Sequence, residues 1–118
     1  MAGPVDLSGA VDLHCHFGPD AHRARSVSAI EAVQEAKAAG HAGVVLKSHD
    51  QPTTLLAWAL DALVDGIAVR GGLCCDREVG GVNPAAVEVA LNTGAAVVWL
   101  PTLSSEQDVL NGVAAQLG

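Results

Sequence analysis

The chain has 118 residues, a net charge of −7 and only six lysines and arginines, so its length fits one domain and its charge argues against a nucleic-acid surface. Half of the residues are hydrophobic and only 3% are aromatic, which predicts a folded core built mainly from alanine, valine and leucine and excludes a disordered chain.

The three cysteines are an odd number that includes an adjacent pair, which indicates reduced thiols and no disulfide framework. The first residues have neither the basic start nor the apolar run of a signal peptide, and no stretch reaches the ~18 apolar residues of a membrane helix. We therefore expect a cytoplasmic protein without a membrane partner.

Four apolar segments alternate with four segments of helical pattern. In chain order we predict a strand over 11–17, a helix over 26–39 capped by Ser26 or Ser28, a strand over 42–46, a helix from Thr53 or Thr54 to about 64, a strand over 67–73, a helix from Asn83-Pro84 to 94, a strand over 95–100, and a helix from Ser104 or Ser105 to the end.

The first predicted strand ends in His14-Cys15-His16. Side chains alternate along a strand, so the two imidazoles point to the same face and Cys15 points to the other. Two converging neutral imidazoles can share a divalent metal ion, zinc first and manganese as an alternative. The other interpretation is that one histidine belongs to the core and the other to a loop.

The second predicted strand leads into Lys47-Ser48-His49, which repeats the same spacing. His49 is a third candidate metal ligand, supported by the neighbouring Asp50. Lys47 is a candidate catalytic residue, either as a base or, after reaction with carbon dioxide, as a carbamate ligand. It could equally bind a phosphate or carboxylate, or form an ion pair with Asp50 or Asp12.

The third predicted strand is followed by Asp76, which could ligate a metal, act as a general base or be a solvated turn residue. The glycine-rich segment 78–84 precedes a helix start whose backbone amides could hold an anion, which makes Asn83 a candidate substrate-binding residue. Arg23, on the loop after the first strand, is a second candidate, although a solvated loop would also explain it.

Apolar strands that alternate with helices predict an α/β fold with a parallel sheet. The repeats correspond to about four units of a TIM-barrel-like fold, a half barrel, since eight units need about 200 residues or more. A small open α/β sheet is the alternative. No linker divides the chain, so we treat residues 1–118 as a single, partial barrel domain with its candidate site at the carboxyl ends of the strands.

The segment 11–16 resembles the opening motif of the amidohydrolase superfamily and also that of the polymerase-and-histidinol-phosphatase (PHP) superfamily. Together with 43–49, 71–73, 79–84 and 98–102, it looks like a group of uncharacterised bacterial amidohydrolase-like proteins. The resemblance covers about residues 10–105, the N-terminal half of such a fold.

This resemblance implies a distorted (βα) barrel in which a hydroxide bound to one or two divalent metals attacks a cyclic amide or ester of a small molecule. His14 and His16 match the first-strand ligands, and His49 stands where PHP enzymes carry the histidine of their second motif. The bridging lysine of amidohydrolases lies on the fourth strand, whereas Lys47 ends the second, and PHP enzymes usually carry an acidic residue at that place.

Three functions follow as expectations: an amidohydrolase-like enzyme that is truncated and weakly active or inactive alone, a PHP-like phosphoesterase, or a non-catalytic remnant of the fold. A half barrel exposes two strand edges and an apolar face, so we also expect the chain to self-associate.

Overall fold

Within residues 3–112, which the computed structural model describes, strands and helices alternate as the sequence predicts. The strands are β1 (Val11–Cys15), β2 (Gly43–Leu46), β3 (Ala68–Cys74) and β4 (Ala95–Trp99). The helices are α1 (Ala29–Ala38), α2 (Thr54–Leu63), α3 (Pro84–Asn92) and α4 (Glu106–Asn111), and a 3₁₀ turn, η1 (Arg77–Val79), was not predicted. The end of the last predicted helix, over 113–118, lies outside the described residues.

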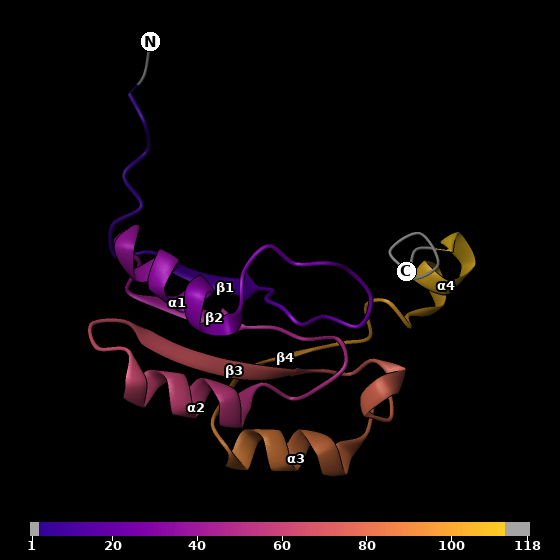
Figure 1. Cartoon of the computed structure of the whole chain (residues 1–118). Helices are drawn as coiled ribbons and strands as arrows, with labels where there is room; N and C mark the ends of the chain where they lie inside the picture. The colour runs from indigo at the N-terminus through magenta and orange to yellow at the C-terminus, as the bar shows by residue number, and fades with distance from the viewer. Residues whose placement is uncertain (1–2, 113–118) are drawn as a thin grey trace.

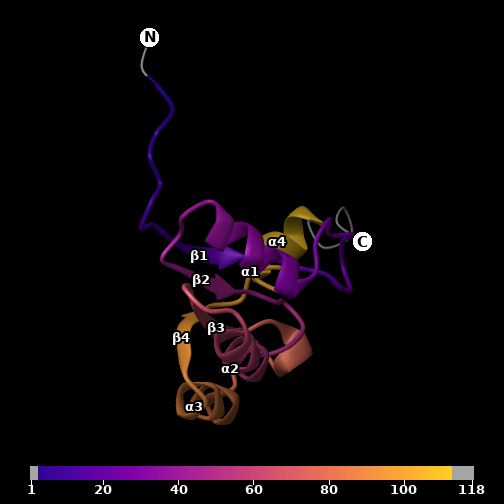
Figure 2. The same cartoon turned by 60° about the vertical axis from the view of Figure 1, so that its left-hand side comes forward.

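The four strands form one parallel sheet in the order β1-β2-β3-β4. Figure 1 shows the strand arrows pointing the same way, with the loop after β1, η1 and α4 beyond their carboxyl ends. In Figure 2, α1, α2 and α3 follow the curved sheet in order, α1 beside β1 and β2, α2 beside β3 and α3 beside β4. The predicted parallel α/β sheet of βα units is therefore confirmed.

Capping residues fix where the helices begin. The Ser28 hydroxyl accepts a hydrogen bond from the Glu31 amide at 3.3 Å and donates one to the Glu31 carboxylate at 2.9 Å, which starts α1. Ser105 caps α4 in the same way, since its hydroxyl accepts a hydrogen bond from the backbone amide of Asp108. Thr53, before α2, makes no cap bond; its hydroxyl bonds the Leu46 carbonyl at 2.7 Å and so ties the helix start to β2.

The largest apolar cluster lies between the sheet and its helices. Val44 and Leu46 of β2 and Val69 of β3 pack there against Val33 of α1 and Leu60 of α2. Cys15 packs against this cluster, as predicted for the residue between the two histidines. Because side chains alternate along a strand, Lys47, His14 and His16 belong to the opposite face.

Within the described part of the chain, no helix combines the length and the apolar character that crossing a bilayer requires.

Candidate metal centre

His14 and His16 converge at the carboxyl end of β1. Their Nε2 atoms are 3.0 Å apart, and their ring centroids are 4.9 Å apart. Burial, followed by the charge of Arg25, lowers the pKa of His16 to about 4, and burial, followed by the charge of Lys47, lowers that of His14. Both rings are therefore neutral near pH 7, which is the form that binds a metal ion.

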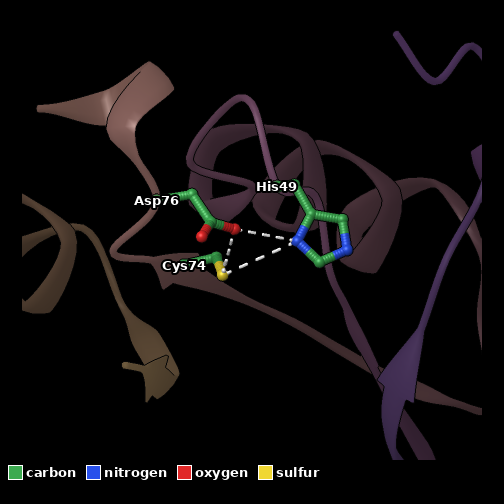
Figure 3. Close-up of side chains that lie close together, drawn as sticks. All are labelled: His49, Cys74 and Asp76. Carbon is green, nitrogen blue, oxygen red and sulfur yellow. Dashed lines mark hydrogen bonds and ion pairs between the residues drawn. The ribbon is translucent and has the colours of Figure 1, made fainter. Parts of the chain in front are cut away.

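His49 follows β2 and lies beside this pair. Its ring stacks on that of His16, with 5.0 Å between centroids and 26° between planes. Its Nδ1 is 2.9 Å from Asp76 Oδ2 and 2.8 Å from Thr102 Oγ1. Figure 3 shows Nδ1 facing Asp76 and Cys74 while Nε2 points away from them. A proton on Nδ1, donated to the carboxylate, leaves the Nε2 lone pair free for a cation.

The partner of His49 differs from the one that the sequence suggested. We expected Asp50, the adjacent residue, to support His49. In the structure Asp50 Oδ1 is 2.6 Å from His22 Nε2, and Asp76, from the end of β3, takes the supporting position. The reason is tertiary: the carboxyl ends of neighbouring parallel strands meet, so His49 reaches across to the residue that follows β3.

Asp76 is fully buried and both of its carboxylate oxygens accept hydrogen bonds. Oδ1 accepts from the amides of Thr102 and Ser104 at 2.8 and 3.0 Å and from the Ser104 hydroxyl at 2.9 Å. Burial opposes ionisation, but the hydrogen bonds from Ser104, Cys74, His49 and Thr102 outweigh it and hold the pKa of Asp76 well below its ordinary value. Asp76 is thus not the solvated turn residue that the sequence allowed: it is buried, and its contacts direct it to His49. Its part as a general base stays a prediction.

Cys74, together with His49 and Asp76, forms a second group of side chains of the types that bind metal ions. One ligand atom each of His49, Cys74 and Asp76 lies within 4.8 Å of the others (Figure 3). However, burial raises the pKa of the Cys74 thiol to about 11, and the thiol donates to Asp76 Oδ2 at 3.1 Å. The Cys74 thiol and the Thr102 hydroxyl both donate to the carboxylate that holds His49, so we assign this group to the support of His49.

Lys47 and Trp99 form the neighbouring part of the same sheet face. Lys47 is 3% exposed, and its Nζ lies 5.0 Å from the centre of the Trp99 ring, at cation–π distance. The ion pair to Asp50 or Asp12 that the sequence allowed does not form: among residues 3–112, no carboxylate pairs with Lys47. The Trp99 ring is also 6.2 Å from that of His14.

Trp99 and Thr102 are site residues that the sequence did not single out as candidates. Trp99 reaches the site because its side chain lies over Gly72 of β3. A Cβ at Gly72 would lie 2.5 Å from the indole ring. A glycine within an apolar strand was the signal that could have indicated this close approach.

The two predicted substrate-binding residues are placed elsewhere. The Asn83 side chain accepts a hydrogen bond from the backbone amide of Ala85 and caps α3. Its role at the start of this helix therefore accounts for an asparagine at this position. Arg23 is exposed on the loop after β1, and Arg25, not Arg23, forms the ion pair with Asp20. No hydrogen bond or ion pair of the described residues joins either predicted side chain to the three histidines, and their part in substrate binding stays a prediction.

The fold and the site together define a parallel α/β protein with three histidines and a buried lysine at the carboxyl ends of its first two strands. A family model described as a family of unknown function, DUF6282, matches residues 9–116. The chain belongs to this family. No curated protein and no solved structure matches the chain.

Proposed function

We propose that this protein is a metal-dependent hydrolase of a small molecule, in which His14, His16 and His49 hold one divalent cation. Zinc is the first candidate and manganese the second, because imidazole nitrogens suit both ions. The observation that carries the proposal is the 3.0 Å approach of the His14 and His16 Nε2 atoms, with the His49 ring stacked alongside. Two uncharged imidazole nitrogens at this separation, with a third imidazole ring beside them, offer the kind of donors that bind such a cation.

The surrounding residues have separate parts in this proposal. A divalent cation at the three histidines supplies Lewis-acid activation of the scissile group and a lowered pKa of water. Asp76 keeps the proton of His49 on Nδ1 and thereby orients Nε2. Lys47 provides a fixed positive charge beside the cation, suited to an anionic group of the substrate, and Trp99 gives this face an apolar surface.

We also propose that the sheet is part of a TIM-barrel-like fold. The strand order follows the chain order without reversal, whereas doubly wound sheets change direction at a switch point. Helices α1 to α3 pack along the sheet in that same sequence (Figure 2). In barrels of this kind, catalytic residues lie at the carboxyl ends of the strands, where the histidines are found.

A phosphoesterase is the second candidate, and Lys47 is the observation that favours it. Its ammonium group is buried without a carboxylate partner among residues 3–112, and a phosphate ester would supply the missing negative charge. A screen of cyclic amides and esters against phosphate monoesters would separate the two reactions. Under the phosphoesterase proposal, Lys47→Met raises KM for phosphate monoesters and leaves metal content unchanged.

Metal analysis tests the proposal directly. We expect the purified chain to bind zinc or manganese stoichiometrically at pH 7 and the His14→Gln/His16→Gln variant to lose that cation. His41→Gln is the matched control, because His41 precedes β2 at the opposite end of the sheet. A chain that binds no metal, or a double variant that binds as much as His41→Gln, would contradict the proposal and favour a non-catalytic remnant.

A further inference from the structure

A second group of metal-ligand side chains lies outside the three-histidine centre. His22 is on the loop after β1, Asp50 follows β2, and Glu78 is in η1 after β3. One ligand atom of each lies within 4.8 Å of the others. Three separate loops therefore converge at one point beyond the carboxyl ends of the first three strands.

The His22 Nε2 atom is the centre of this group. It lies 2.6 Å from Asp50 Oδ1 and 3.9 Å from Glu78 Oε1. The backbone amide of His22 donates to Asp20 Oδ1 at 2.8 Å, which holds the turn that presents the ring. The shorter distance is a hydrogen bond, and the longer one leaves Glu78 facing the same nitrogen without a bond to it.

The charges in the group are unbalanced. The side chain of Asp50 is 19% exposed and that of Glu78 is 26% exposed, on a residue that as a whole belongs to the surface, and both face one imidazole. The other basic partner is Arg77, whose Nε is 3.1 Å from Glu78 Oε1, but its side chain is 77% exposed and such a pair contributes little. A divalent cation between the carboxylates would neutralise them and replace their mutual repulsion with attraction.

The space beside the group fits an ion with water. A cavity of about 40 Å³ is lined by His22, Glu78 and Ser104, together with Arg77, Leu103 and Val109. A single water needs roughly 10–15 Å³ of such space, so one or two waters fit beside His22 and Glu78. Asp50 is not part of the lining of this cavity and faces His22 from outside it.

We propose that His22, Asp50 and Glu78 form a second divalent-cation site, distinct from the centre of His14, His16 and His49. One imidazole and two carboxylates are a ligand set for Mn²⁺ or Zn²⁺. The cation joins the loop after β1 to the residues that follow β2 and β3. It also lies next to the first centre, because the His22 ring is edge-on to that of His49 with 6.4 Å between centroids. This site does not depend on the proposed hydrolase activity.

The test counts bound Mn²⁺ per full chain. Metal-free protein is titrated with Mn²⁺ alone, and free Mn²⁺ is followed by electron paramagnetic resonance. We expect two ions per wild-type chain, and one in Glu78→Gln and in His22→Gln. The matched control is Glu88→Gln, which removes the same charge from an exposed position of α3 and should keep both ions. A Glu78→Gln chain that binds as many ions as Glu88→Gln overturns the inference.

The His14→Gln/His16→Gln variant separates this inference from the proposed function. If that variant keeps all bound Mn²⁺ while Glu78→Gln loses an ion, the hydrolase centre fails and the second site stands. The reverse pattern overturns the second site alone. Circular dichroism confirms that each variant is folded, and Glu78→Gln, on a partly exposed turn, is the variant that decides if His22→Gln does not fold.

Protease protection gives an independent readout. Trypsin cleaves after the exposed Arg23, which adjoins His22 on the loop after β1. If cleavage requires release of the ion, Mn²⁺ at ten times its Kd should slow it about tenfold in the wild type and not in Glu78→Gln. Equal cleavage rates with and without Mn²⁺ in the wild type overturn the inference.

Discussion

At the scale of single residues, Asp76 connects the chain segments that form the site. Its carboxylate accepts hydrogen bonds from His49 after β2, from Cys74 of β3, and from Thr102 and Ser104 after β4. The three segments are far apart in sequence, so one buried side chain fixes the geometry of the candidate metal centre. Removing its charge leaves several buried donors without an acceptor.

We predict that Asp76→Asn lowers the free energy of unfolding by about 3 kcal/mol. The buried groups that donate hydrogen bonds to the Asp76 carboxylate would lose their charged acceptor. The substitution should also weaken metal binding by about 10–100-fold, as the loss of a histidine's supporting carboxylate does. Urea denaturation and Mn²⁺ titration measure the two effects. Asp65→Asn, at an exposed position after α2, is the control and should change neither.

The lowered pKa of Asp76 predicts a pH dependence of stability. A carboxyl group whose pKa is lower in the folded state stabilises the fold above its ordinary value of 3.8, and this contribution is lost as the pH falls below that value. The free energy of unfolding of metal-free wild type should therefore decrease from about pH 5 downward. In Asp76→Asn the decrease should be smaller, and equally steep curves for the two proteins would contradict the prediction.

At the scale of elements, β3 determines how β4 contributes to the site. Gly72 leaves room for the Trp99 ring, because a Cβ there would lie 2.4 Å from the Val97 carbonyl oxygen and 2.5 Å from the indole. The ring thereby reaches Lys47, which directly follows β2, across the intervening strand. A glycine on one strand and a tryptophan on the next are thus required together.

We predict that Gly72→Ala destabilises the protein by about 1–3 kcal/mol, because the added methyl group overlaps backbone and ring atoms. It should also displace the indole from Lys47 and change the tryptophan fluorescence of the folded state. Gly3→Ala is the control, since a Cβ at Gly3 has no neighbour within 4 Å. If both variants unfold at the same urea concentration, the close approach of β3 and β4 is not a constraint.

At the scale of the whole molecule, the sheet has two free edges, β1 and β4, in the described part of the chain. Large apolar side chains near these edges are exposed, among them Leu13 at 59% and Leu100 at 74%. Unpaired strand edges beside exposed apolar side chains favour association between chains. Self-association therefore stays our prediction for the isolated chain.

Size-exclusion chromatography with light scattering tests this prediction. We expect the mass to rise with concentration toward a dimer or larger species, and Ala96→Lys on the exposed side of β4 to reduce association, because an edge lysine opposes strand pairing. Ala62→Lys on α2, away from both edges, is the control and should associate as the wild type does. A single monomer peak at every concentration would contradict the prediction.

The sequence by itself determined the alternation of strands and helices and the shared face of His14 and His16. These features depend on local periodicity and on capping residues such as Ser28, which neighbouring residues specify. Only the tertiary structure decided that Asp76, not Asp50, supports His49 and that Trp99 covers Lys47. These contacts join residues on different strands, and the packing of the sheet sets them, so no local pattern could predict them.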